Sequence, residues 1–338
     1  MSKVTSLDVA AKAGVSRSAV SRVFTPGASV SKGTADKVRK AAAALGYRPN
    51  VIARSLNTGR SRIIGLVVAY LENQFYPEAI ERLSKALQAK GYHVLVFMAS
   101  NDHEATQSVI DELLDYQVDA IIAASVGLSN DLTSRCEALG IPILLFNRHQ
   151  YDERLTSVCS DNLSGGRRLA EYLVAGGHKR IGHIAGWEGA STQIDREAGF
   201  RAGLDAAGMT LFARQSGNFN FEQAKEAARR MFDASDRPDA VFVANDHMAF
   251  AVMDVLRFEL GLKVPDDVSV VGYDDVALAS WPAYDLTTIR QPANRMVAGA
   301  VDALMARLDG DDTAPQSIVL EGPLVIRGSA RKPKEDMT

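Results

Sequence analysis

The chain has 338 residues, of which 46% are hydrophobic and 23% are charged, and its formal net charge is −3 at pH 7. This size is enough for two or three domains with buried cores, and no apolar run is long enough to cross a membrane. The amino terminus lacks an apolar signal-peptide core, so we expect a cytoplasmic protein without a membrane partner. The two cysteines, Cys136 and Cys159, have neither disulfide-framework nor zinc-site spacing, which predicts buried thiols and no metal or other cofactor.

Charge is distributed unevenly along the chain. Residues 1–60 contain eleven Lys and Arg against two Asp, a surplus of nine positive charges, so residues 61–338 must sum to about −12 for the whole chain to reach −3. This asymmetry is typical of a nucleic-acid-binding arm on an otherwise acidic body.

The basic segment begins with a pattern of two short helices joined by a tight turn. Thr5 and Asp8 form a capping box, and Gly14 ends the first helix. Ser16 caps a second helix, whose Val20 faces inward. The polar side chains of its outer face are Arg17, Ser18, Ser21 and Arg22. A helix-turn-helix places this second helix in the major groove of DNA, where arginine can bond guanine and serine can reach bases or phosphates.

A third helix is predicted over residues 32–45, and it closes a three-helix core. Asn50 then caps the segment 51–59, which is too short to be a stable helix in isolation, so we expect it to order on binding a partner. Its apolar residues Val51, Ile52 and Leu56 suit contact with a partner helix and a wedge between base steps in the minor groove. The alternative is a basic helical subdomain whose charges only solvate its surface, and the helix-turn-helix pattern alone does not exclude it.

Beyond residue 61, short apolar runs alternate with amphipathic segments. The expected strands are residues 63–69, 94–98, 120–124, 143–146, 180–184, 240–244 and 268–271, with helices among them at 77–89 and 104–116. Apolar strands joined by helices indicate parallel sheets covered on both faces. Because the rhythm restarts near residue 180, we expect two doubly wound lobes.

Ligands of open parallel sheets bind beyond the carboxyl ends of the strands. Residues that follow the apolar runs or lie in the adjoining loops are therefore binding candidates. They include Phe75, Tyr76, Ser125, Asn147, Arg148, Asn245, Asp246, Asp274, Phe219 and Trp281. Aromatic faces mixed with carboxylates, amides and arginines suit a polyhydroxylated molecule. For any one of these residues, a helix cap or ordinary packing is the simpler interpretation.

Several stretches of the basic segment form a specific pattern: Leu7–Ala10, Ala13–Ser16, Val20–Val23, Leu45–Asn50 and Ala53–Leu56. In them the chain resembles the lactose/galactose repressor (LacI/GalR) family, and the similarity extends over essentially its full length. The resemblance implies that Arg17, Ser18 and Arg22 read the major groove, that Leu56 intercalates, and that two chains bind a pseudo-palindromic operator. The full set of DNA-binding candidates is Thr5, Ser16, Arg17, Ser18, Ser21, Arg22, Asn50, Ala53 and Leu56.

Three stretches of the body look like the family's effector cleft: residues 195–200, 243–246 and 272–275. The effector contacts that they imply are Arg196, Asn245 or Asp246, and Asp274, with Asp161, Thr192 and Phe219 added by weaker local similarity. Residues 286–292 match a further family signature near the point where the chain crosses back between the lobes. The chain ends in a polar tail without a leucine heptad, which favours a homodimer over a tetramer.

The expected fold is therefore a small all-α helix-turn-helix headpiece and an α/β periplasmic-binding-protein-like body of two parallel-sheet lobes. The expected domains are a headpiece at 1–48, a hinge helix and linker at 49–61, an amino-terminal lobe at 62–160 and 291–322, and a carboxy-terminal lobe at 161–290 and 323–338.

The resemblance implies a transcriptional regulator, in the first instance a repressor, whose operator affinity is controlled by a sugar or sugar derivative held between the lobes. Arg148 and Arg196 also leave room for a sugar acid or sugar phosphate. The alternative is a periplasmic-type solute-binding protein for sugar uptake, which has the same two-lobed architecture. The helix-turn-helix pattern, in the place of a signal peptide, argues against that alternative.

An enzyme is not expected, because the chain has no GxGxxG, Walker, GxSxG or HExxH motif. His178 and His183 flank the start of a predicted strand, where surface polarity or a cap is favoured over metal binding. Asp274 and Asp275 could serve acid/base chemistry in principle, but adjacent side chains usually point apart.

Overall fold

The structure is a computed structural model that describes residues 4–25, 27–48, 60–99, 103–150, 152, 154–233, 236–311 and 314–333, with residues 103–105 described by their backbone only. The chain divides into two compact units, residues 1–62 and 63–338. Asn50, Ala53 and Leu56, which the sequence places in the hinge, lie outside the described residues. Within the described ranges, no helix has both the length and the apolar character needed to cross a bilayer.

The first unit is a bundle of α1 (Ser6–Ala13), α2 (Arg17–Val23) and α3 (Lys32–Leu45). Local signals fix the helix ends. Thr5 donates its backbone N–H to Asp8 Oδ2 at 2.8 Å, and Gly14 ends α1 in the left-handed region with φ 67°. The Oγ of Ser16 accepts the backbone N–H of Ala19 at the start of α2. The buried core is Val9, Ala10, Val20, Val38, Ala41 and Ala42. The predicted helix-turn-helix and the third helix are confirmed.

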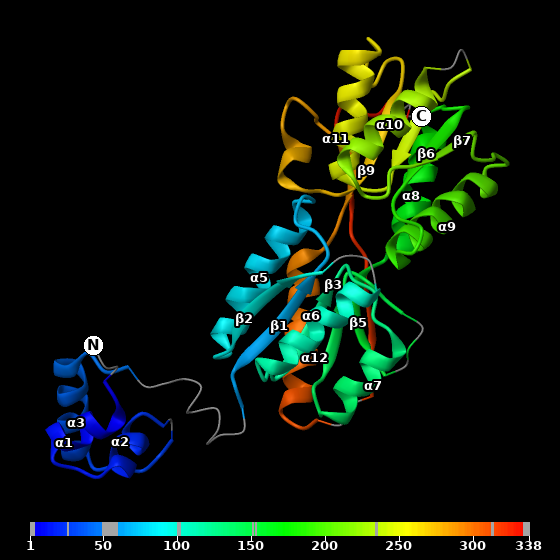
Figure 1. Ribbon diagram of the computed structural model, residues 1–338. Helices are drawn as coiled ribbons and strands as arrows, with labels where there is room; N and C mark the ends of the chain where they lie inside the picture. Colours follow the sequence, from blue (N-terminus) through cyan, green and yellow to red (C-terminus); the bar gives the residue numbers. More distant parts are fainter. Residues whose placement is uncertain are drawn as a thin grey trace, which may run out of the picture. The chain divides into compact units, whose positions relative to one another are not determined.

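The second unit contains two six-stranded sheets (Figure 1). The first has the order β11-β5-β4-β3-β1-β2 and is parallel throughout. Its strands are β1 (Ile63–Val68), β2 (His93–Met98), β3 (Ala120–Ala124), β4 (Ile143–Phe146), β5 (Thr156–Ser160) and β11 (Ser317–Leu320). Its helices are α5 (Phe75–Ala89), α6 (His103–Asp115), α7 (Asn130–Ala138) and α12 (Ala293–Leu308). Ile64 and Leu66 pack with α5 and α12, whereas Val67 packs with α6 and α7, so helices cover both faces.

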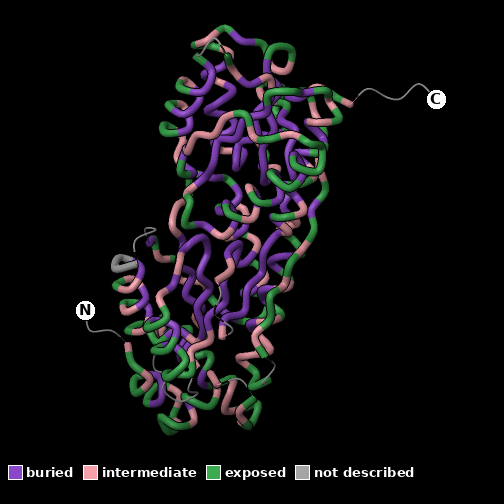
Figure 2. Tube along the Cα trace, turned by 90° about the vertical axis from the view of Figure 1, so that its right-hand side faces the viewer, coloured by how far each residue is buried: buried purple, intermediate pink, exposed green. Residues whose placement is uncertain are grey.

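The second sheet has the order β12-β10-β9-β8-β6-β7. Its strands are β6 (Ile181–Ala185), β7 (Ala213–Ser216), β8 (Ala240–Val243), β9 (Ser269–Asp274), β10 (Thr287–Arg290) and β12 (Leu324–Val325). Its helices are α8 (Asn162–Ala175), α9 (Ser191–Ala206), α10 (Phe221–Phe232) and α11 (Asp246–Asp254), which continues as a π-helical turn over Val255–Glu259. Val241 and Val243 pack with α10 and α11, and Phe242 packs with α8 and α9. Figure 2 shows buried residues gathered in the interior of the second unit, where β3, β4, β5, β6, β8 and β9 are buried along their whole length.

We call the first sheet with its helices the first lobe, and the second sheet with its helices the second lobe. The chain passes between the two sheets three times: between β5 and α8, between β10 and α12, and between β11 and β12. The residue boundaries expected for the domains stay a prediction.

The body departs from the sequence-based expectations in three places. β2 is an edge strand, and Val96 and Met98 on it are 43% and 49% exposed, so this apolar run is not covered on both faces. β12 pairs antiparallel with β10. The interpretation of His178 and His183 as surface or capping residues was wrong, because both are buried.

Candidate nucleic-acid interface and effector site

The outer face of α2 presents the polar side chains that the sequence places there. Arg17, Ser18, Ser21 and Arg22 are all exposed. Arg17 Nε donates to Ser6 Oγ at 3.2 Å, and within the described residues neither arginine of α2 forms an ion pair. These cationic donors are therefore available to an anionic partner.

Two further DNA-binding candidates have structural roles in the headpiece. Ser16 caps α2 and bonds Ser18 Oγ at 2.9 Å, and Thr5 Oγ1 donates to Asp8 Oδ2 at 2.8 Å. Their exposure still allows a contact with phosphate, but the fold alone already explains both residue types.

In the body, several strands end in residues with unusual backbone conformations. Ser125 after β3 has φ 64°, Asn147 after β4 has φ 57°, and Asp274 at the end of β9 has φ 131°. Non-glycine residues at positive φ cost about 1–3 kcal/mol each and are common at binding sites. The same edge of each sheet therefore carries both polar side chains and backbone strain, as expected for a site beyond the carboxyl ends of the strands.

Arg196 of α9 is held by groups from three elements. Its Nε donates to Asn162 Oδ1 at 2.8 Å, its Nη1 to the Ala244 carbonyl at 2.7 Å, and its Nη2 lies 3.5 Å from Asp274 Oδ1. The guanidinium also stacks 3.7 Å from the centre of the Tyr273 ring. Arg196 is 2% exposed, so its charge is neutralised within the protein rather than by water.

Glycines in α8 and α9 make this placement possible. A Cβ on Gly166 would lie 2.1 Å from the Arg196 carbonyl oxygen, and one on Gly199 would lie 1.9 Å from the Leu163 carbonyl oxygen. The backbones of the two helices are therefore in direct contact. This contact sets the distance between α8 and α9, and thereby the position of Arg196 relative to the second sheet.

Asp274 joins the two lobes. Asn73, in the loop after β1, donates to Asp274 Oδ2 at 2.9 Å, and Gln291 Nε2 donates to Oδ1 at 2.6 Å. Burial raises the pKa of Asp274, while Arg196 and these hydrogen bonds oppose the rise. Asp275 points away, toward Arg290 and Arg327, as expected for adjacent side chains.

Asn245 and Asp246, which the sequence left as alternatives, differ in their hydrogen bonding. Both oxygens of Asp246 are occupied inside the second lobe, by Thr288 Oγ1 at 2.7 Å and the Val276 backbone N–H at 3.0 Å. Burial and the charge of Asp274 raise the pKa of Asp246 to about 7. Asn245 caps α11 through its Oδ1, which leaves its amide nitrogen free for a ligand.

Buried polar atoms without partners mark the edge of both lobes. Arg148 Nη2 donates to Ser125 Oγ at 3.2 Å, and its guanidinium lies 5.7 Å from the ring centre of Trp187 in the second lobe. Within the described part of the chain, the partnerless atoms at these strand ends and at the crossing into α12 are Asn147 Oδ1, Arg148 Nε and Nη1, Asn245 Nδ2 and Gln291 Oε1. Leaving a buried polar atom unsatisfied costs about 1–3 kcal/mol. Such a set is matched by a ligand rich in hydroxyl groups.

The remaining candidates lie around these atoms or apart from them. Phe75 and Tyr76 are buried at the start of α5, and Phe75, Asp274 and Gln291 line a cavity of about 600 Å³. Thr192 is buried one turn before Arg196, and the Phe219 ring packs against Gly186. Asp161 caps α8 and accepts the Tyr273 hydroxyl on its carbonyl. Trp281 is 55% exposed, so the structure does not bring it into the buried cluster.

Comparison with known proteins decides the family. A profile of bacterial regulatory proteins of the lacI family matches residues 5–50, and one of periplasmic binding protein-like domains matches residues 170–330. The chain is 32% identical over 329 residues to the HTH-type transcriptional repressor PurR of Vibrio vulnificus (strain CMCP6), covering 96% of this chain and 98% of that protein. The chain belongs to the lacI family.

Solved structures agree with this assignment. The LacI-family chain is similar to the Lac repressor dimer bound to operator and the anti-inducer ONPF, with TM-score 0.87 and 30% identity over 97% of this chain and 99% of that one. It is also similar to a complex of the transcriptional regulator CelR with cellobiose, with TM-score 0.74 and 31% identity over 97% of this chain and 100% of that one. The family and the fold class expected from the sequence are confirmed.

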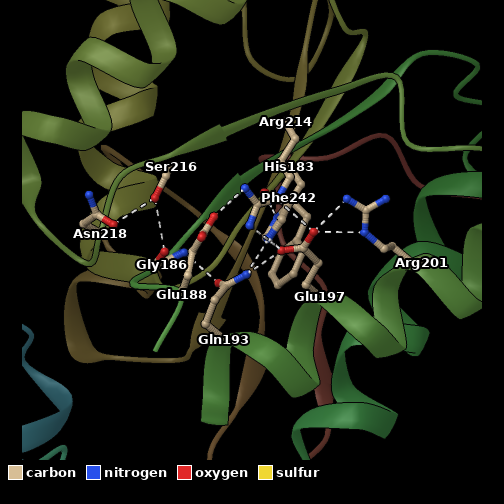
Figure 3. A network of polar contacts seen from close by, with 10 residues as sticks. All are labelled: His183, Gly186, Glu188, Gln193, Glu197, Arg201, Arg214, Ser216, Asn218 and Phe242. Carbon is tan, nitrogen blue, oxygen red and sulfur yellow. Dashed lines mark hydrogen bonds and ion pairs between the residues drawn. The ribbon is translucent and has the colours of Figure 1, made fainter. Parts of the chain in front are cut away.

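A buried polar network supports α9 and the Trp187 loop of this LacI-family chain (Figure 3). His183 Nδ1 lies 2.9 Å from the Phe242 carbonyl, and Gln193 Nε2 lies 3.1 Å from His183 Nε2. Gln193 Oε1 accepts the Gly186 backbone N–H at 2.6 Å, so one side chain joins α9 to the loop before Trp187. Burial lowers the pKa of His183 to about 4, which keeps the ring neutral at physiological pH.

Glu197 is the acidic centre of the same network. Arg214 and Arg201 donate to it at 2.8–2.9 Å. Burial alone would raise the pKa of Glu197, but the hydrogen bonds from Arg214, the charge that His183 gains below about pH 4 and the hydrogen bond from Arg201 lower it to about 2. The network thereby anchors the helix that carries Thr192 and Arg196.

Sequence reasoning missed Asn73, Asn162, Tyr273 and Gln291 in the LacI-family body. Asn73 lies in the loop after an apolar run, so a strand-end search extended by a few residues would have found it. Gln291 lies within the 286–292 stretch that was used only to place the lobe crossing. Asn162 and Tyr273 act through Arg196, and only the folded structure reveals that relation.

Proposed function

We propose that this LacI-family chain is a DNA-binding transcriptional repressor whose affinity for its operator is controlled by a small sugar-like effector held between the two lobes. The observation that carries the proposal is the set of buried, partnerless polar atoms on strand ends of both lobes, in a chain that also presents an exposed cationic helix-turn-helix.

The proposed DNA contacts begin with the four outward residues of α2. Arg17 and Arg22 supply guanidinium forks for guanine or phosphate, and Ser18 and Ser21 supply hydroxyls. The similar Lac repressor structure is a dimer bound to operator, which supports a homodimer on a pseudo-palindromic site here. Leu56 and its neighbours complete the proposal as a minor-groove wedge, although they lie outside the described residues.

The proposed effector is a polyhydroxylated molecule, and the similar CelR structure contains cellobiose. Asn147, Arg148, Asn245 and Gln291 offer both donors and acceptors, which a sugar hydroxyl can satisfy in either direction. Phe75 and Tyr76 contribute the apolar surface on which the C–H face of a sugar packs. Arg196 and Asp274, which are already paired, act together as a preorganised hydrogen-bonding wall.

Control of DNA binding follows from lobe closure. An effector that bonds strand ends of both lobes favours one relative arrangement of them, and in a dimer this changes the spacing of the two segments that precede the first lobes. Couplings of this kind are about 1–3 kcal/mol, roughly 5- to 150-fold in affinity, and they are reciprocal between DNA and effector.

The decisive experiment uses the full chain. A preferred duplex is selected from a random pool, and its affinity is titrated at fixed salt with and without sugars that raise the melting temperature of the protein. We expect a symmetric site bound at least about 10³-fold more tightly than random duplex, with an affinity that changes when the sugar is added. A chain that binds sugar but prefers no DNA sequence would instead be a solute-binding protein, and the regulator proposal would be abandoned.

A further inference from the structure

A second set of contacts between the lobes lies beside the effector residues. The loop after β4 belongs to the first lobe, and its His149 reaches α9 of the second lobe. The backbone N–H of His149 donates to Ser191 Oγ at 3.0 Å, and its ring Nε2 lies 2.7 Å from Asp195 Oδ2. His149 of the first lobe therefore forms two hydrogen bonds with the first turns of α9.

These contacts act on the same turn of helix as the effector site. Ser191 and Asp195 enclose Thr192 in the sequence, and Arg196 follows directly. His149 likewise follows Arg148, whose guanidinium faces Trp187 across the lobes. A rigid-body movement of the lobes that separates His149 from α9 therefore also moves Arg148 away from Trp187.

Two other polar bridges between the lobes differ from this one in burial and in distance. Asn73 and Asp274 form a buried bridge at 2.9 Å. His247 and Glu72 are 3.8 Å apart, and the Glu72 side chain is 69% exposed, which makes that pair weak. The side chains of His149 and Asp195 are 28% and 31% exposed, so this pair is close enough to bond and open enough to exchange protons with water.

We propose that the contacts of His149 with Ser191 and Asp195 form a latch that holds the lobes closed around the effector residues, and that loss of a proton from His149 loosens it. His149 and Asp195 are then positioning residues, since they act through closure. The link to effector affinity rests on the proposed function, whereas the latch itself is a property of the free protein.

The groups around His149 determine the direction in which its pKa is shifted. The hydrogen bond that the His149 ring donates to Asp195 on α9 raises the pKa of His149, while partial burial and the charge of Arg148 on its own loop lower it, and the net shift is upward from 6.5. Cys159 on β5 interacts electrostatically with Asp195. Burial raises the pKa of the Cys159 thiol to about 12, so this side chain stays neutral.

Because His149 binds its proton more tightly when the latch is closed, the latch should weaken as the pH rises. Opening the latch returns His149 toward its ordinary pKa, so the closed form binds the proton more tightly than the open form. The latch is fully formed below about pH 6.5 and weakens as the pH rises through the raised pKa, where a neutral ring keeps one hydrogen bond but loses its charge. Each unit between the open and closed pKa values corresponds to a ten-fold change in the ratio of closed to open protein.

Trp187 provides a reporter that needs no effector. The chain has two tryptophans, so Trp281→Phe leaves Trp187 as the only one, with the Arg148 guanidinium beside it. In this background, acrylamide quenching is measured from about pH 5.5 to about pH 9. The proteins compared are the parent, His149→Gln, Asp195→Asn and the control His93→Gln, which removes an exposed histidine of β2.

We expect quenching of the parent to increase with pH, with a midpoint above 6.5, and the His93→Gln control to follow the parent. His149→Gln should lose this transition, and Asp195→Asn should move its midpoint downward toward 6.5. A parent whose quenching is independent of pH, or a transition that persists unchanged in His149→Gln, overturns the latch. If His149→Gln fails to fold, the shift of midpoint in Asp195→Asn alone decides.

Operator titrations on the same proteins separate the two proposals. If the quenching transition depends on His149 but the chain binds no specific duplex, the latch proposal is supported and the regulator proposal is rejected. If the chain binds specific DNA but shows no such transition, the regulator proposal is supported and the latch proposal is rejected.

Discussion

Replacing Gly166 by alanine should displace the backbone of Arg196 without changing the Arg196 side chain itself. The new Cβ would lie 2.1 Å from the Arg196 carbonyl oxygen and 3.0 Å from the Phe200 nitrogen, both backbone atoms that cannot rotate away. Relief requires α8 and α9 to separate by about 1 Å, an overpacking strain of about 1–3 kcal/mol. The same shift stretches the 2.7 Å bond from Arg196 to the Ala244 carbonyl, which adds about 1 kcal/mol.

The total loss, about 2–4 kcal/mol in the free energy of unfolding, can be measured by urea titration followed through tryptophan fluorescence. The matched control is Gly299→Ala in α12, where the added Cβ meets only Ile318 side-chain carbons at 3.8 Å and should leave stability unchanged or raise it by about 0.5–1 kcal/mol. We also expect Gly166→Ala to lose its response to any sugar that stabilises the parent. An unchanged urea midpoint together with an unchanged sugar response would refute the argument that backbone contact sets the position of Arg196.

Three further outcomes are expected. Arg196→Ala leaves Asp274 as an uncompensated buried charge, so it should destabilise the body by about 3–5 kcal/mol and abolish the thermal shift by sugar, while operator binding at low temperature survives. Leu56→Ala should weaken specific DNA binding more than non-specific binding in titrations at one salt concentration; equal losses would argue against a wedge. Acid should destabilise the second lobe between pH 6.5 and about 4, because the unfolded His183 ring binds a proton there and the buried ring, with a pKa of about 4, does not. The full effect is about 3 kcal/mol, and a urea midpoint independent of pH in this window, or a His183→Gln variant with the same slope as the parent, would contradict it.

Elements with local signals were predictable from the sequence. The pair Thr5 and Asp8 caps α1, and Ser16 caps α2. Each cap satisfies backbone N–H groups of its own helix, so these helix starts can be predicted without knowledge of tertiary contacts. The apolar runs of β3 and β4 were predicted with the bounds that the structure shows. β5 was missed because its polar residues Thr156, Ser157 and Ser160 are typical of a loop. In the structure this strand is buried between β4 and β11.

The binding site was predictable only in outline. The rule for strand ends finds Ser125, Asn147 and Arg148, since it depends on topology alone. It cannot tell that Asp246 is occupied by Thr288 and a backbone amide, because those partners are distant in sequence. The burial of His183 escaped prediction for the same reason, since the groups that satisfy its ring come from Phe242 and Gln193.

The threefold passage of the chain between the sheets has a consequence for how this protein is made. β11 and β12, which complete the edges of the two sheets, are the last strands of the described chain to be synthesised. A nascent chain halted before residue 317 would therefore expose a bare strand edge on each lobe, the kind of surface that recruits other polypeptides. Both lobes thus depend on the same short stretch of the chain, residues 317–325, and no single cut in the polypeptide can release either lobe with its sheet intact.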